Sequence, residues 1–191
     1  NAFTARDYTG YYQQVPSARL HEVMRLEADR FANTQWPDAE FKREIEVVKE
    51  ERRLRTDDSP RARLYESLSA AAFVASPYRR PVIGWMNDLE NLTWQDAHYW
   101  YTQWYSPSNA YVVVVGDVDH TEVFRLAKKY YGVNKAHAMP ERKPQNEPEQ
   151  KGWRRVNVKA PAKLPYLSML WKVPRLRDAH KDRDPYALEV L

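Results

Sequence analysis

Apolar side chains recur with helical spacing along most of the chain. A repeat at positions i, i+3, i+4 and i+7 predicts a helix that buries one face. Leu20, Val23, Met24 and Phe31 share such a face. Helices are predicted on this basis over residues 17–34, 37–56, 59–75, 93–105 and 119–131, and from residue 184 onward.

Residues with strong positional preferences mark the ends of these helices. Pro37 suits a first helical turn, where its missing N–H is not needed. Thr93 and Asp96 have the spacing of a capping box, in which each side chain bonds to the other residue's backbone. Asp119 is a good N-cap, and Gly132 ends the helix that follows it.

Shorter stretches rich in aromatic and β-branched residues predict strands. Residues 1–4 and 8–15 are rich in Tyr, Thr and Phe, and the valine run within residues 109–117 is typical of a buried strand. Residues 153–158 and 166–173 are also strand-like. Between them and the helices, residues 133–152 contain three prolines and no apolar period, which predicts a linker.

The most highly charged predicted helix places two carboxylates among apolar positions. At about 100° per residue, an apolar arc runs from Leu54 through Val48 to Ile45, and Glu44 and Glu51 fall inside it. A carboxylate directed toward a core needs a cation, a hydrogen-bond network or a metal. An internal ion pair with an arginine and a metal or catalytic role both remain open.

The order of motifs along the chain resembles a known peptidase family. Asn1-Ala2-Phe3-Thr4, then a helix, then the pair Glu44 and Glu51, resembles the pitrilysin/insulinase family of zinc peptidases, whose signature begins with H-x-x-E-H. Further matches to bacterial members of this family cover the rest of the chain: residues 78–84, 104–109, 112–119 and 184–191. The resemblance therefore spans nearly the whole sequence.

This resemblance implies a fold and a division of the chain. The expected fold class is α+β, with helices packed on a mixed, largely antiparallel sheet like that of mitochondrial processing peptidase. Residues 1–132 would be the C-terminal part of one α/β peptidase unit, residues 133–152 a linker, and residues 153–191 the start of a second unit. The chain is expected to be truncated at both ends.

The resemblance also implies roles for individual residues. Glu51 would be the third zinc ligand, and Glu44 would hold a ligand imidazole by its N–H. A salt bridge to Arg30 or Arg52 is the alternative for Glu44. The segment of Asn1, Ala2, Phe3 and Thr4 would be an edge strand onto which an extended peptide substrate adds, with an ordinary sheet strand as the alternative.

The remaining part of the expected zinc site lies outside this sequence. The five histidines, which are His21, His98, His120, His137 and His180, have no H-x-x-E-H spacing. We expect this stretch alone to be inactive as a peptidase and to bind zinc weakly or not at all. The whole protein is expected to be a zinc metalloendopeptidase. The alternative is a non-catalytic partner subunit of the same family that forms part of the peptidase chamber.

Composition excludes other classes of function. The net charge is +4 and the pI about 9.2, yet cations alternate with acids and no nucleic-acid-binding motif is present, so nucleic acid is not an expected partner. No stretch is long and apolar enough to span a membrane. Without cysteine, the periplasm or cytoplasm of a bacterium both fit. Exposed strand edges predict association with a second copy or a related subunit.

Overall fold

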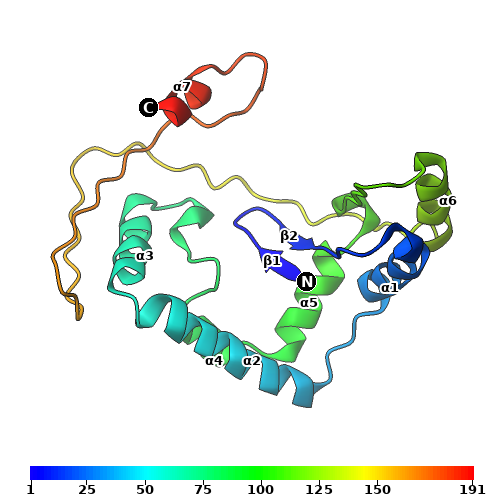
Figure 1. The fold of residues 1–191 in the computed structure, drawn as a ribbon. Helices are drawn as coiled ribbons and strands as arrows, with labels where there is room; N and C mark the ends of the chain where they lie inside the picture. Colours follow the sequence, from blue (N-terminus) through cyan, green and yellow to red (C-terminus); the bar gives the residue numbers. More distant parts are fainter.

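The regular structure of the chain is mostly helical. The computed structural model describes all residues from 1 to 191 (Figure 1). It contains the helices α1 (Leu20–Asn33), α2 (Asp38–Arg52), α3 (Pro60–Ala72), α4 (Met86–Asn91), α5 (Trp94–Trp104), α6 (His120–Tyr130) and α7 (Asp184–Val190). A π-helical turn, Arg53–Asp57, joins α2 to α3. Short 3-10 turns lie at Ser17–Arg19, Pro77–Arg79 and Pro107–Asn109.

The helix boundaries follow the capping signals in the sequence. Thr93 accepts from the backbone N–H of Asp96, whose carboxylate accepts from the N–H of Thr93, so the predicted capping box at the start of α5 is confirmed. The carboxylate of Asp119 accepts from the N–H of Glu122 at the start of α6. Each cap satisfies a backbone donor that has no partner inside the helix.

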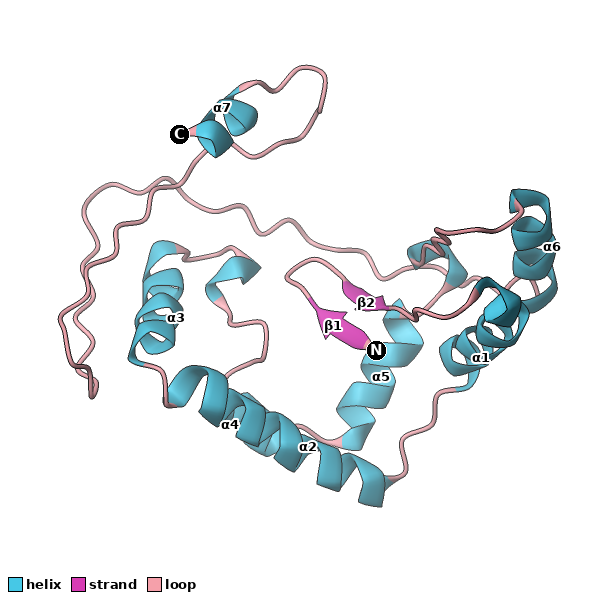
Figure 2. Cartoon of the chain, viewed as in Figure 1, coloured by secondary structure: helices cyan, strands magenta, loops and turns pink.

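One small antiparallel hairpin forms the entire sheet. Strands β1 (Ala2–Thr4) and β2 (Thr9–Tyr11) pair with Phe3 opposite Gly10 (Figure 2). The Phe3 ring lies so close to Gly10 that a Cβ added there would be 2.3 Å from the ring. A glycine is therefore needed beneath this ring. The predicted combination of helices with an antiparallel sheet is confirmed only in part, because the chain is dominated by helices.

Three predicted strands do not form. Residues 110–115 have no strand structure, and Tyr111 and Val115 are 97% and 90% exposed, so the prediction of a buried strand over 109–117 is wrong. The predicted strands over 153–158 and 166–173 are extended chain without a ladder. A strand requires a neighbour that accepts and donates its backbone hydrogen bonds. None of these segments has such a neighbour in the structure.

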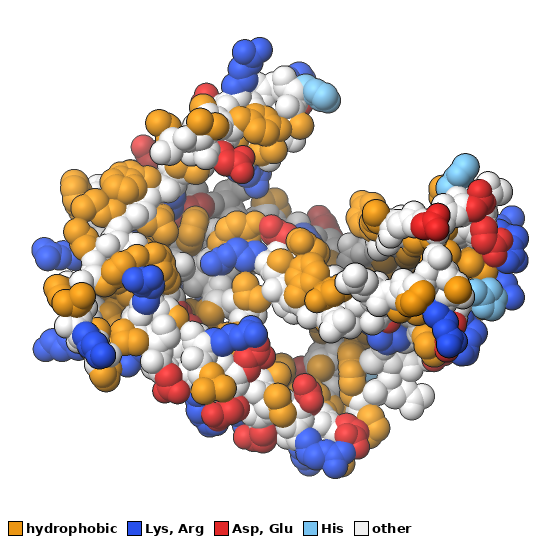
Figure 3. All heavy atoms as spheres, in the orientation of Figure 1, with side chains coloured by type: hydrophobic (Ala, Val, Ile, Leu, Met, Phe, Trp, Pro, Cys, Tyr) orange, Lys and Arg blue, Asp and Glu red, His pale blue; other side chains and the backbone are white.

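Buried side chains gather where helices meet. Met24 and Ala28 of α1 pack with Leu126 of α6, which is 1% exposed. Leu89 is buried on α4, which packs against α2, and Ala72 is buried at the end of α3. Many large apolar side chains remain at the surface (Figure 3). No helix combines the length and the apolar character that crossing a membrane requires.

Candidate functional site

Helix α2 presents one stripe of side chains to its neighbours. Its members follow the i, i+4, i+7 spacing of one helix face, and all are at least half-buried. They are Phe41, Ile45, Val48 and Arg52 of α2, with Thr56 of the π turn that follows. This face packs against α4 and the start of α5, leaving a hollow of about 240 Å³ between them. The packed stripe fixes how α2 is rotated and thereby where its carboxylates point.

The two glutamates lie beside this stripe and not within it. Glu44 is exposed, while the side chain of Glu51 is 39% exposed and its carboxylate lies 2.6 Å from the Arg55 guanidinium. The prediction that the carboxylate points toward the core is wrong for Glu44, whereas Glu51 is half-buried; Leu54, which was placed in the apolar arc, is exposed. The buried side of α2 is the one that carries Phe41, because that side packs against α4 and α5.

The charge that is buried on this helix belongs to Arg52. It is 5% exposed and forms two hydrogen bonds with the Glu66 carboxylate of α3, of 2.8 and 3.0 Å. It also donates to the Gly84 carbonyl at 2.8 Å, and its Nε has no partner. The hydrogen bonds that Arg52 donates to the Glu66 carboxylate raise the pKa of Arg52 above its usual value. Arg52 therefore joins α2, α3 and the loop before α4.

The sequence contained a signal for Arg52 that the apolar arc obscured. Arg52 lies four residues after Val48 and eleven after Phe41, so it falls on the packed face. The sequence offers Arg52, like Arg30, only as an alternative salt-bridge partner of Glu44. Both alternatives are wrong in the structure, because Arg52 pairs with Glu66 and Arg30 pairs with Glu27.

A π turn follows the glutamates directly. The N–H of Asp58 donates to the carbonyl of Arg53, five residues earlier, at 2.9 Å. Thr56 is buried within this turn. Such single π turns interrupt α-helices often at functional sites. Glu51 thus lies in the last turn of α2, immediately before the interruption.

The N-terminal segment forms one edge of the hairpin. Ala2, Phe3 and Thr4 pair only with β2, and the Asn1 carbonyl accepts from the N–H of Tyr12 at 2.9 Å. All four residues, Asn1 to Thr4, are exposed. The opposite edge of β1 has no strand beside it, so its outward-facing backbone groups are free to bond to another strand.

Tyrosine and arginine side chains attach the hairpin to the helices. The Tyr11 and Tyr105 hydroxyls lie 2.6 Å apart, and burial is the main cause that raises the pKa of Tyr105. The Arg30 guanidinium stacks on the Tyr11 ring at 3.7 Å. At the hairpin tip, Tyr78 donates to Asp7 at 2.6 Å. No sequence pattern indicates these contacts, because the two hydroxyl contacts join residues 94 and 71 positions apart.

The donors in this chain do not form a zinc site by themselves. No group of three or more His, Cys, Asp or Glu side chains is close enough together to hold a metal ion. His21 bonds to Tyr130, and His137 lies beside Ser106 in another part of the chain. Glu51 is a single carboxylate, whereas catalytic zinc takes three protein ligands.

Family models match both halves of the chain. The model described as "Insulinase (Peptidase family M16)" matches residues 1–85, and the model described as "Peptidase M16 inactive domain" matches residues 91–191. Neither match tests the predicted boundaries at residues 132 and 152.

Curated proteins and solved structures give the same picture. The zinc protease PqqE of Helicobacter pylori is 37% identical over the whole chain, which spans 43% of that protein. An uncharacterised zinc protease of Mycobacterium leprae is 36% identical over 69% of the chain and 29% of its own length. The crystal structure of a protease from Helicobacter pylori matches with a TM-score of 0.75 at 38% identity, over 80% of this chain and 37% of that one.

Proposed function

Because this chain belongs to the insulinase family, peptidase family M16, we propose that it is part of a zinc-dependent metalloendopeptidase that cleaves peptides or unfolded segments. The observation that supports this most strongly is the 37% identity to a zinc protease over the entire chain. The chain spans less than half the length of the curated relatives it matches. The other ligands and the general base would come from an H-x-x-E-H segment of the whole protein.

We assign the third zinc ligand to Glu51. Its present partner, Arg55, is mostly exposed and lies one turn away on the same helix. Exposed pairs of this kind contribute little free energy, so the carboxylate can exchange the arginine for a metal at small cost. Arg52, the next residue, is fixed by Glu66 and Gly84, which holds the last turn of α2 in place. Zinc would supply a polarised water for attack on the peptide carbonyl.

Glu44 has the supporting role in this proposal. It lies seven residues before Glu51, on the same side of α2, and forms no ion pair in the chain. A carboxylate in this position is available to accept the N–H of a ligand imidazole and fix its orientation. Its loss would weaken zinc binding without removing a ligand.

The substrate strand is assigned to β1. Residues Asn1 to Thr4 are exposed and one edge of β1 is unpaired. An extended peptide can add to such an edge through backbone hydrogen bonds, which recognise the chain and not its sequence. The hairpin is attached to α5 and to the loop around Tyr78, so this edge is held in position.

Three glutamine substitutions in the full-length protein test these roles. Glu51→Gln should abolish both bound zinc, measured by elemental analysis, and peptide cleavage. Glu44→Gln should reduce zinc affinity roughly ten- to a hundredfold and recover activity with added zinc. The control is Glu50→Gln, whose carboxylate pairs with Arg53 on another side of α2 and which should behave as wild type.

Two outcomes would overturn the proposal. Equal, mild effects of Glu51→Gln and Glu44→Gln on zinc content would assign both glutamates to structural ion pairing. A wild-type full-length protein that carries no zinc and cleaves no peptide would instead support the non-catalytic partner subunit.

A further inference from the structure

A carboxylate from the segment 133–152 lies against the end of helix α3. Glu147 accepts hydrogen bonds from three consecutive backbone N–H groups, those of Val74, Ala75 and Ser76, at 2.9 to 3.0 Å. Successive N–H groups that converge in a turn form a concave anion site. The Lys172 ammonium lies 2.8 Å from the same carboxylate. One acidic side chain thus binds two distant parts of the chain.

The site is partly enclosed and strongly favours the charged carboxylate. The side chain of Glu147 is 16% exposed and that of Lys172 is 28% exposed. The ammonium of Lys172 also lies over the Phe73 ring, 5.6 Å from its centre. The Lys172 contact, followed by the backbone N–H groups, lowers the pKa of Glu147 to about 2.

Other contacts bring the following segment to the same helix. Arg154 donates to the carbonyls of Ala71 and Ala72 at 2.8 and 2.9 Å, which satisfies acceptors at the C-terminal end of α3. The hydroxyl of Tyr166 lies 2.9 Å from that of Tyr65. Residues 147–172 therefore contact α3 and the loop after it at several points, although they form no sheet.

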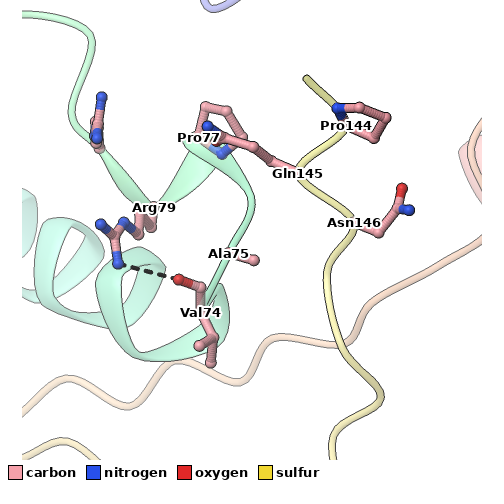
Figure 4. A pocket seen from close by; sticks show the side chains of 8 residues that line it. Val74, Ala75, Pro77, Arg79, Pro144, Gln145 and Asn146 are labelled. Atoms are coloured by element: carbon pink, nitrogen blue, oxygen red, sulfur yellow. Dashed lines mark hydrogen bonds between the residues drawn. The ribbon is translucent and has the colours of Figure 1, made fainter. Parts of the chain in front are cut away.

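A hollow of about 400 Å³ lies beside the carboxylate. One wall consists of Val74, Ala75, Pro77, Arg79 and Arg80, and the other of Pro144, Gln145 and Asn146 (Figure 4). Arg79 donates back to the Val74 carbonyl at 3.0 Å and stiffens the first wall. The second wall is the stretch that leads directly into Glu147. The Glu147 contacts thus lie next to the hollow and join its two walls.

We propose that the loop Val74–Ser76 is a carboxylate-binding site whose occupant is Glu147 of the same chain. This contact, the Glu147 latch, fixes residues 133–152 as a strap and holds residues 153–173 on α3. The latch determines where the C-terminal part of the chain lies relative to α3 and, through α3, to helix α2, which carries Glu44 and Glu51. It goes beyond the proposed peptidase function and requires neither zinc nor catalysis.

Two measurements test the latch. The chain has no cysteine, so spin labels at Ala70→Cys on α3 and Met169→Cys in the docked segment give one clean distance. In the otherwise unchanged protein this distance should be narrowly distributed, and Glu147→Ala should broaden it. Hydrogen exchange of the Val74–Ser76 amides should become at least about tenfold faster, because bonds to a charged acceptor are lost.

Matched variants separate the latch from general disorder. Glu149→Gln removes an exposed carboxylate two residues away and should change neither measurement. Lys172→Met keeps most of the side chain and should broaden the distance while the Val74–Ser76 amides stay protected. Unchanged distance and exchange in Glu147→Ala would overturn the proposal, as would a broad distance in the parent protein. Since neither readout involves zinc, the proposed function can fail without affecting this result.

Discussion

Helix α3 and the loop after it are held by ionic contacts of different kinds. In the middle of the helix, Glu66 forms a bidentate pair with Arg52, which is almost fully buried. After its end, Glu147 is bound by backbone N–H groups and by Lys172. The two carboxylate side chains are 15% and 16% exposed, so the difference lies in their partners: Arg52 is 6% exposed and Lys172 is 28% exposed. Removing Arg52 leaves the Glu66 carboxylate without a counter-charge, whereas without Lys172 the Glu147 carboxylate keeps its three backbone N–H donors. The Arg52–Glu66 pair therefore stabilises the fold, whereas the Glu147 latch positions residues 153–173 on α3.

The largest expected effect comes from breaking the buried pair. Arg52→Met should lower the free energy of unfolding by about 3–5 kcal/mol, because it leaves the Glu66 carboxylate buried without a partner. Denaturant unfolding followed by circular dichroism measures this change. The double variant Arg52→Met with Glu66→Leu should recover most of the loss. Arg53→Met, which breaks only an exposed pair with Glu50, should leave stability nearly unchanged.

An equal loss in Arg52→Met and Arg53→Met would contradict the distinction between the buried pair of Arg52 and the exposed pair of Arg53. It would mean that the pair with Glu66 is exposed to solvent in solution.

A smaller effect is expected at the first residue before α3. The Ser59 hydroxyl accepts from the N–H of Ala62 at 3.3 Å. Ser59→Ala removes this cap and should cost about 1 kcal/mol of unfolding free energy, measured by thermal or denaturant unfolding. Ser69→Ala, in the interior of the same helix, should be neutral or stabilising because alanine is the better helix former. A loss in Ser69→Ala as large as that in Ser59→Ala would mean that the hydroxyl does not act as a cap.

Lowering the pH should have the smallest effect on overall stability. It should first change the position of residues 153–173 relative to α3, because it protonates Glu147. The pKa of Glu147 lies at about 2, below its ordinary value of 4.5. A lowered pKa means that the contact is fully present above pH 4.5 and is lost as the pH falls toward 2. The spin-label distance should therefore stay narrow from pH 7 to 5 and broaden below 4.5, while Glu147→Ala is broad throughout. Helix content by circular dichroism is followed alongside, and broadening already at pH 6 would assign the change to another group.

Helices were predictable because their signals are local. Thr93, Asp96 and Asp119 determine their helix ends through residues three positions away, and the structure places these caps as expected. Strands depend on distant partners, so the valine run around Val113 could not reveal that no neighbour pairs with it. The family was predictable because several motifs, each weak alone, occur in the family's order along the chain.

The candidate site was predictable only in part. The sequence indicated Glu44 and Glu51 as a pair, but their orientation depends on which side of α2 packs against α4 and α5. The apolar arc suggested one side, and the buried Arg52 shows another. A charged residue on the packed face weakens the apolar periodicity of that face. The sequence pattern therefore predicts another side of α2 as the buried one. The roles of Glu51 and Glu44 remain predictions that the full-length variants test, and the role of Asn1 to Thr4 also remains a prediction.

The π turn after α2 also limits which changes in chain length this region can accept. Surface connections usually tolerate gain or loss of a residue, and residues 53–55 are exposed. Here, however, the five-residue turn sets the angle at which α3 leaves α2. Deleting one residue would advance the helix by about 100° and carry Glu66 away from Arg52. Among natural relatives, insertions and deletions should therefore be rare between Arg52 and Ser59, even where the side chains vary freely.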